Sequence, residues 1–249
     1  MTNTEVSRPK VAFWLETESH QACEIARLVG YDILVIDREH GAVPAHALDR
    51  IVPFARSIGL TVHVRVAAAD RTEIQHALDS GADAVILPQI RDLAHAQEAT
   101  RFAKYPPLGA RGLGYNRTMG YAGANDDYFR AENRRCLCYP MIETCGALRD
   151  ASAIAELPTV DGLFIGSGDL SLARGRGAFA ATDDDLADIR RIADAANAAG
   201  KLWAVPALNP KVMDIALAKS AAYVTLGDDL TAMLRGFQAL RDLMPTGAG

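Results

Sequence analysis

Four ionisable residues stand together at the end of an apolar run near the N-terminus. The run YDILVI leads into Asp37, Arg38, Glu39 and His40, and Gly41 follows. A carboxylate beside an imidazole is the arrangement of a general base, because the carboxylate fixes the tautomer of the ring and raises its basicity. We therefore interpret Asp37 and His40 as a candidate base dyad. A solvated surface turn, which the following glycine would suit equally well, is the alternative.

Two further carboxylates follow apolar runs much later in the chain. Glu143 comes directly after YPMI, and Asp169 lies in FIGSGDLS. Two carboxylates without an accompanying Cys or His ligand pattern favour a hard divalent cation such as Mg²⁺ or Mn²⁺. The alternative for each is a helix cap, and Asp169 before LSLA fits a cap well. Their pairing at equivalent strand ends favours the metal.

An arginine and a glycine-rich turn add groups that could hold an anion. Arg65 is embedded in the apolar run VHVRV. Its guanidinium cannot lose its proton, so it needs an anionic or carbonyl partner, either a substrate or a structural ion pair. The turn Gly166-Ser167-Gly168 precedes an expected helix, and backbone N–H groups at a helix start favour a carboxylate.

The elements that must position these residues are eight short β-rich runs, alternating with amphipathic Ala-rich segments. Eight strands each followed by a helix predict a closed (β/α)₈ TIM barrel, and we expect it to occupy residues 1–249 as a single domain. A doubly wound sheet is the runner-up, but the first turn, ETESHQ, lacks GxGxxG. The predicted strands are 11–15, 33–37, 61–66, 84–90, 138–143, 162–166, 202–208 and 223–227.

The barrel prediction brings the candidate residues together. Active sites of such barrels form at the C-terminal ends of the strands, which is where the ionisable residues named above fall. One segment, 104–136, interrupts the alternation of predicted strands and helices. It is too long for an ordinary connection, so we expect a functional loop or insert near the active site or an interface.

Composition excludes several classes of protein. The formal charge of −5 argues against a nucleic-acid binder, and no apolar run approaches the roughly 20 residues that span a bilayer. The N-terminus carries no signal-peptide core. The four cysteines show neither zinc-ribbon nor CxxC spacing, so a reduced, cytoplasmic setting is the simplest interpretation. They are Cys23, Cys136, Cys138 and Cys145.

The combination of these motifs resembles the HpcH/HpaI family of metal-dependent class II 2-oxo-acid aldolases, whose type members split 4-hydroxy-2-oxoheptanedioate. The resemblance covers about residues 10–235. It is carried by WLETESHQACEIARLVGYDILVIDREHG, the arginine of VRV, GADAVILPQI, GARGLG, MIET and VDGLFIGSGDLS. DxEHG together with IET and FIGxxDLS is specific, whereas any one of them alone is not.

The resemblance implies a cytoplasmic homo-oligomer, usually a hexamer built from dimers that exchange the last helix. It implies cleavage of a 4-hydroxy-2-oxo acid or 2-keto-3-deoxy acid to pyruvate and an aldehyde, through a pyruvate enolate on bound Mg²⁺, Mn²⁺ or Co²⁺. No Schiff base is needed, and no lysine lies at the C-terminal end of a predicted strand.

The same resemblance assigns roles to individual residues. Glu143 and Asp169 match the metal-binding acids, Asp37 and His40 the proton-handling dyad, and Arg65 the arginine on the keto oxygen. Asp79 matches an acid that reaches a neighbouring subunit's site. Trp14 and Phe164 match wall positions, Gly166, Ser167 and Gly168 the turn that holds the pyruvyl carboxylate, and Glu39 a residue supporting the metal's water network.

Departures from the family pattern bear on the acceptor aldehyde. Arg38 stands where a small or apolar residue is common, and we favour an outward salt bridge over recruitment of an acidic substrate tail. Met141 replaces a glutamine, and Ser167 replaces a proline in the turn.

Two alternative functions remain open. A malyl-CoA or citryl-type thioester lyase would have similar metal acids, but such chains are generally longer. A catalytically silent barrel should lack one of Glu143, Asp169 or His40, and all three are present.

Overall fold

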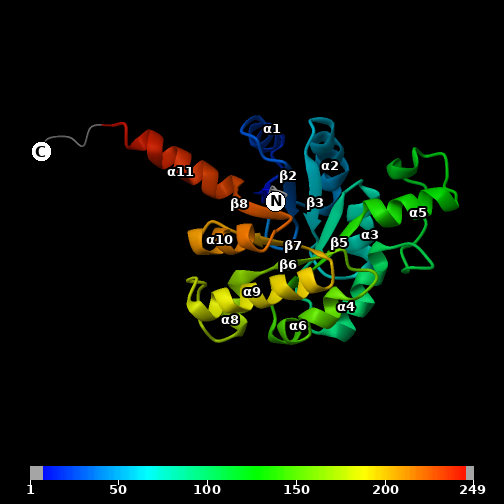
Figure 1. Cartoon of the computed structure of the whole chain (residues 1–249). Helices are drawn as coiled ribbons and strands as arrows, with labels where there is room; N and C mark the ends of the chain where they lie inside the picture. The colour runs from blue at the N-terminus through cyan, green and yellow to red at the C-terminus, as the bar shows by residue number, and fades with distance from the viewer. Residues whose placement is uncertain (1–7, 245–249) are drawn as a thin grey trace, which may run out of the picture.

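The protein is a closed barrel of eight parallel strands in sequential order (Figure 1). This computed structural model describes residues 8–244, so the ends of the expected domain, 1–7 and 245–249, lie outside the described residues. Each predicted apolar run forms a strand, which confirms the (β/α)₈ fold. The strands are β1 (Lys10–Leu15), β2 (Ile33–Asp37), β3 (Thr61–Arg65), β4 (Ala84–Leu87), β5 (Leu137–Ile142), β6 (Gly162–Ile165), β7 (Leu202–Pro206) and β8 (Tyr223–Asp228).

Helices surround the barrel, and the amphipathic segments predict the main ones correctly. Several expected helices end one or two residues before a glycine with positive φ, for example Gly30, Gly59, Gly81 and Gly200. The α-helices are α1 (His20–Leu28), α2 (Leu48–Ser57), α3 (Arg71–Asp79), α4 (Leu93–Thr100), α5 (Asp126–Arg135), α6 (Cys145–Arg149), α7 (Ala151–Ala155), α8 (Ser167–Ala173), α9 (Asp183–Ala198), α10 (Pro210–Ala218) and α11 (Asp229–Arg241). Short 3₁₀ turns are η1 (Ala45–Ala47), η2 (Arg101–Ala103) and η3 (Arg117–Met119).

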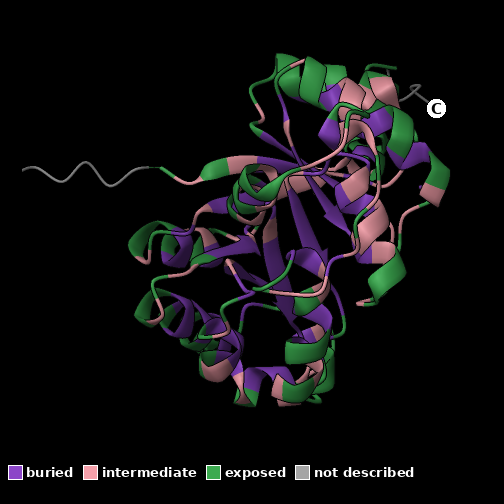
Figure 2. Cartoon of the chain, turned by 90° about the vertical axis from the view of Figure 1, so that its right-hand side faces the viewer, coloured by how far each residue is buried: buried purple, intermediate pink, exposed green. Residues whose placement is uncertain are grey.

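The core has two parts, because each strand is apolar on both faces. Figure 2 shows the central strands as largely buried. Outward-facing strand residues such as Leu34 and Ile36 pack with the inner faces of the helices, whereas inward-facing residues such as Val35 and Phe164 fill the barrel. Alternation along each strand therefore sends every second side chain into the barrel interior.

An aromatic layer closes the lower part of that interior. The His63 ring stacks near Tyr139 with centroids 5.8 Å apart, and its Nδ1 lies 3.2 Å from the hydroxyl of Tyr223. Burial lowers the pKa of His63 to about 3, so this histidine is neutral and part of the core. The inward positions above this layer form the mouth of the barrel.

The 104–136 segment is not a simple loop. It contains η3 and the ten-residue helix α5, which protrudes beside α3 in Figure 1. Arg111 anchors it, because this buried guanidinium pairs with Asp79 at 2.7 Å and lies over the ring of Tyr105. The α5 sequence is too polar to show a strong apolar stripe, which is why its pattern suggested a loop. No helix in the described part of the chain is long and apolar enough to cross a membrane.

Candidate active site

A cleft of about 230 Å³ lies at the C-terminal ends of the strands, where the sequence predicts the active site. Seven of the predicted site residues line it: Trp14, Asp37, Arg65, Gly166, Ser167, Gly168 and Asp169. Four residues not predicted as site residues also line it: Glu16, Met141, Pro206 and Asp228. The barrel therefore gathers most of the predicted set from separate strands into one mouth.

Asp37 and Arg65 form a buried ion pair at the ends of β2 and β3, where the two residues are register partners. Arg65 Nε donates to Asp37 Oδ1 at 2.9 Å, and Nη2 donates to Oδ2 at 2.5 Å. Arg65 Nη1 also lies 3.1 Å from Glu39 Oε2, and the guanidinium sits 4.8 Å from the centre of the Trp14 ring. Burial alone would lower the pKa of Arg65, but Asp37 in particular raises it. Because a guanidinium has five N–H groups, donors remain for a substrate oxygen.

His40 is not oriented by Asp37 in this structure, contrary to the dyad expected from the sequence. Asp37 Oδ1 accepts hydrogen bonds from the backbone N–H groups of Glu39 and His40, at 3.0 and 3.2 Å. The His40 ring is largely exposed, and its Nε2 lies 3.8 Å from Glu39 Oε2. The physical reason is competition: Arg65 and two amides already occupy the Asp37 carboxylate. Asp37 thus organises the turn and Arg65, whereas the imidazole faces solvent.

Glu143 directly follows β5 and is buried beside Gly166, which lines the cleft. Its Oε1 accepts the backbone N–H of Gln89 at 2.5 Å, and its Oε2 is buried with no hydrogen-bond partner. Burial raises its pKa from the ordinary value of 4.5 to about 7; the Gln89 N–H lowers it, and the charges of Glu39 and Asp169 raise it further. An orphaned, buried carboxylate oxygen is costly unless something binds it, which makes it available to a cation.

The turn between β6 and α8 brings Asp169 near enough to Glu143 for its charge to raise the pKa of Glu143. A Cβ on Gly166 would lie 2.5 Å from Glu143 Oε2, so only glycine lets the turn approach this carboxylate. Asp169 follows in the first turn of α8 and lines the cleft, but it caps no helix, since Gly166 is the N-cap. Among the described residues, no cluster of three or more His, Cys, Asp or Glu side chains is arranged to hold a metal ion. A cation here would take two protein carboxylates and its remaining ligands from water or substrate.

The predicted wall residues pack against each other at the base of the cleft. The rings of Trp14 and Phe164 meet edge-on with centroids 5.8 Å apart. Trp14 is half-buried and lines the cleft, whereas Phe164 is fully buried behind it. Phe164 therefore supports the wall without being part of its surface.

Arg38 and Asp79 pair with charged residues away from the cleft. Arg38 forms an ion pair with Glu73 of α3, which confirms the salt bridge, although the Arg38 side chain is only 9% exposed. Asp79, at the end of α3, accepts a hydrogen bond from Arg111 at 2.7 Å. Asp79 therefore anchors the 104–136 segment within its own chain.

Sequence reasoning did not single out three residues at the mouth. Glu16, directly after β1, and Asp228, the last residue of β8, supply carboxylates, and Gln89 holds Glu143 through its backbone. Glu16 could have been found, since it follows the apolar run VAFWL as Glu143 follows YPMI. Gln89 adopts a left-handed φ of 54°, a conformation that no sequence pattern here indicates.

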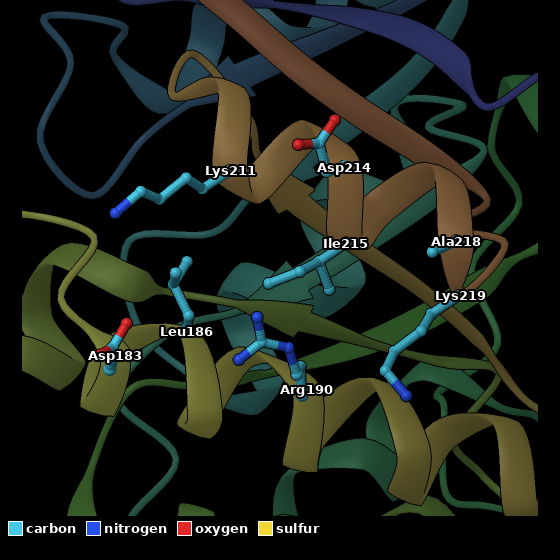
Figure 3. Close-up of a pocket in the computed structure, with 8 residues that line it drawn as sticks. All are labelled: Asp183, Leu186, Arg190, Lys211, Asp214, Ile215, Ala218 and Lys219. Atoms are coloured by element: carbon cyan, nitrogen blue, oxygen red, sulfur yellow. The ribbon is translucent and has the colours of Figure 1, made fainter.

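A second cavity, of about 450 Å³, lies outside the barrel between α9 and α10 (Figure 3). It contains none of the predicted site residues. Its charged lining comes from Asp183, Arg190, Lys211, Asp214 and Lys219.

The fold and the mouth define a barrel enzyme with paired acids and an arginine at its strand ends. Comparison with known proteins is more specific. Residues 10–235 match the model of the HpcH/HpaI aldolase/citrate lyase family. The chain therefore belongs to the HpcH/HpaI aldolase/citrate lyase family.

Individual relatives agree with this assignment. The chain is 31% identical to a 2-keto-3-deoxy-L-rhamnonate aldolase of Klebsiella pneumoniae over 88% of this chain and 83% of that protein. It is also 31% identical to a 4-hydroxy-2-oxo-heptane-1,7-dioate aldolase of the same species, over 95% and 89%. A crystal structure of a family member from Burkholderia cenocepacia superposes with a TM-score of 0.85 at 26% identity, covering 95% of both chains. These similarities identify a carbon–carbon lyase of the aldolase type.

Proposed function

We propose that the protein is a metal-dependent aldolase that reversibly cleaves a 4-hydroxy-2-oxo acid, or a 2-keto-3-deoxy acid, to pyruvate and an aldehyde. The observation that carries the proposal is the buried, unpartnered oxygen of Glu143 beside Asp169. The named relatives cleave substrates of these two kinds.

Glu143 and Asp169 are the residues that would hold the divalent cation. The donor set fits, because both are hard oxygen ligands, and Glu143 Oε2 has no competing hydrogen bond. When bound, Mg²⁺, Mn²⁺ or Co²⁺ would act as a Lewis acid that stabilises negative charge on the substrate. Glu39 would support this centre electrostatically, since its charge is among those that raise the pKa of Glu143.

The substrate carboxylate would bind at the turn formed by Gly166, Ser167 and Gly168. This turn lines the cleft at the start of α8, and no atom lies within 4 Å of a Cβ built on Gly168. The adjacent guanidinium of Arg65 would donate to the keto oxygen and stabilise the charge that develops there during carbon–carbon cleavage. Trp14 would form the wall against which the substrate lies.

His40 would remove the proton of the 4-hydroxyl group during cleavage and return it during synthesis. Its exposed ring has no hydrogen-bond partner among residues 8–244, so both ring nitrogens are available to substrate or water. Asp37 would contribute indirectly, by fixing the 37–40 turn and Arg65. This division of work replaces the direct Asp37–His40 contact predicted from the sequence.

We propose further that the enzyme is a cytoplasmic homo-oligomer, with a hexamer as the expected form. Helix α11 projects from the barrel in Figure 1 and buries only Asp229. An apolar cavity of about 380 Å³ lies between α1 and the start of α11, where a second chain could pack. The expected contribution of Asp79 to a neighbouring site would require release from Arg111. All four cysteines are free, in agreement with a reducing compartment.

The decisive experiment measures pyruvate release from a generic 4-hydroxy-2-oxo acid by chelator-treated protein, before and after Mg²⁺, Mn²⁺ or Co²⁺ is added. We expect release to depend on the metal and to fall at least about a hundredfold in Glu143→Gln. Glu156→Gln is the matched control, because Glu156 is exposed at the end of α7 and should leave the rate unchanged. Pyruvate release that is unchanged after treatment with the chelator would contradict the metal mechanism.

A thioester lyase of the citryl type is the second candidate, because the matching family model includes citrate lyases. The same assay distinguishes it. Cleavage of a malyl or citryl thioester, with no release from any 4-hydroxy-2-oxo acid, would favour the lyase. Failure with both substrate classes and all metals would favour a catalytically silent barrel.

A further inference from the structure

Two carboxylates outside the proposed catalytic set line the cleft, one directly after β1 and one at the end of β8. Glu16 comes two residues after Trp14, so strand alternation points both side chains into the mouth. Asp228 reaches the mouth through an irregularity. Ala12 pairs with Thr225, but Trp14 pairs with Asp228, which inserts one extra residue into β8. Gly227, at φ 92°, accommodates this bulge, and bulges commonly redirect a side chain.

Hydrogen bonds fix the backbone of Glu16 and the side chain of Asp228. The Glu16 N–H donates to Asp229 Oδ1 at 2.9 Å, and its carbonyl accepts the N–H of Ala42 at 2.7 Å. Asp228 Oδ1 accepts the N–H of Thr231 at 2.6 Å as the N-cap of α11, which leaves Oδ2 free for another donor. The backbone position of Glu16 and the orientation of the Asp228 carboxylate are therefore properties of the fold.

In the part of the chain that the structure describes, these two carboxylates have no cationic partner in an ion pair. Within residues 8–244, neither Glu16 nor Asp228 forms an ion pair, and the Glu16 carboxylate accepts no hydrogen bond. Among the described residues, Arg65 is the only cationic side chain that lines the cleft; its charge lowers the pKa of Glu16, but Asp37 and Glu39 already engage its guanidinium. Partial burial and the neighbouring charges of Asp228, Asp37 and Asp229 raise the pKa of Glu16, as expected where negative charges crowd together.

The location of this excess negative charge bears on the acceptor aldehyde. On the proposed function, the pyruvyl carboxylate binds at the turn after β6, and Glu16 and Asp228 lie on the side formed by β8 and β1. A carboxylate on the aldehyde would meet like charges there, which is unfavourable. A hydroxyl group could instead donate to Glu16 or Asp228.

We propose that Glu16 and Asp228 make the acceptor end of the cleft select uncharged, hydroxyl-bearing aldehydes over aldehydes that carry an anionic group. This inference rests on the proposed aldolase function. It predicts that the substrate is a 2-keto-3-deoxy polyol acid and not a dicarboxylate. Charge repulsion excludes the wrong acceptor, and hydrogen bonds to the hydroxyl hold the right one.

The test compares two acceptors of similar length, 4-hydroxybutanal and succinic semialdehyde, in condensation with pyruvate. For the wild type we expect kcat/KM to favour 4-hydroxybutanal by about tenfold or more, and the preference to shrink as salt screens the charges. In Glu16→Gln and Asp228→Asn, kcat/KM for succinic semialdehyde should rise about tenfold. Both replacements keep the side-chain shape, and asparagine remains a good N-cap for α11.

Asp214→Asn provides the matched control, since it removes the same charge from the outer cavity in Figure 3. It should leave the ratio between the two acceptors unchanged. An equal ratio in the wild type, or a ratio that neither cleft variant alters, would overturn the inference. A trimethylammonium aldehyde preferred over 4-hydroxybutanal would overturn the assignment to hydroxyl groups.

Deuterium exchange at the methyl group of pyruvate separates this inference from the proposed function. Exchange needs enolisation of pyruvate but no acceptor. If exchange depends on the metal but the enzyme uses both acceptors equally well, the role of Glu16 and Asp228 is refuted and the aldolase proposal stands. A wild type that neither exchanges nor condenses would refute the aldolase proposal itself.

Discussion

Glu143 illustrates at the scale of one residue how a buried, partly unpartnered carboxylate costs stability. Its carboxylate is buried, receives one backbone hydrogen bond and leaves Oε2 unpartnered. The difference between its ordinary pKa of 4.5 and the value of about 7 corresponds to about 3 kcal/mol of unfavourable charge burial above pH 7. A cation would offset this cost.

This balance predicts a dependence of stability on pH. Between pH 7 and 4.5 the folded carboxyl holds a proton that the unfolded carboxyl has lost, so the unfavourable contribution disappears as the pH falls. We expect metal-free Glu143→Gln to be more stable than metal-free wild type at pH 8, by up to about 3 kcal/mol, and to lose this advantage near pH 5. Denaturant unfolding at both pH values measures it.

The same unfolding measurement in saturating Mn²⁺ tests the other half of this prediction. Because the cation binds the folded wild type, Mn²⁺ should raise the unfolding free energy of the wild type. The wild type should then be more stable than Glu143→Gln. The affinity for Mn²⁺, measured by calorimetry, should fall as protons compete for Glu143 below pH 7. An unfolding difference that does not change with pH or Mn²⁺ would contradict the role given to Glu143.

Individual residues also show which contacts the sequence could not predict. The run VIDREHG correctly indicated a buried strand that ends in charged residues, because its apolar part could only be buried. It could not decide which partner Asp37 takes, since Arg65 is distant in the chain and the two side chains meet only through the β2–β3 register. The same limit hid Gln89, whose contribution is a backbone N–H.

At the scale of elements, the turn between β6 and α8 depends on one glycine. Gly166→Ala would place a Cβ 2.5 Å from Glu143 Oε2 and 2.7 Å from Glu143 Cβ. We expect it to lower the affinity for Mn²⁺ at least about tenfold and the unfolding free energy by about 1–3 kcal/mol. Gly168→Ala is the control, because a Cβ there meets no atom within 4 Å. Similar Mn²⁺ affinities in the two variants would disprove this account of the turn.

Elements differ in how far the sequence determines them. The eight strands could be predicted because strands buried on both faces read as continuous apolar runs. Helix α5 could not, since only Glu132 of its residues is buried and the helix is held by polar anchors such as Arg111. The extra residue in β8 could not be predicted from the sequence either, because a bulge is defined by the pairing of β8 with β1.

At the scale of the whole molecule, α11 predicts self-association. Its exposed apolar residues include Leu234, Phe237 and Leu240, and a monomer rarely leaves such a stripe uncovered. Phe237→Asp should reduce the mass measured by light scattering to that of a smaller oligomer or a monomer. Gln238→Asp adds a charge to the neighbouring exposed position and should leave the mass unchanged. A wild-type mass equal to one chain would refute the oligomer.

The aromatic layer of His63, Tyr139 and Tyr223 has a consequence for the order of events in turnover. Because this layer fills the lower barrel, both products must pass through the same opening. The pyruvyl end would lie against the buried turn at Gly166, so the aldehyde would have to depart before pyruvate can follow. The kinetic signature would be sequential release, in which pyruvate inhibits cleavage competitively and the aldehyde does not.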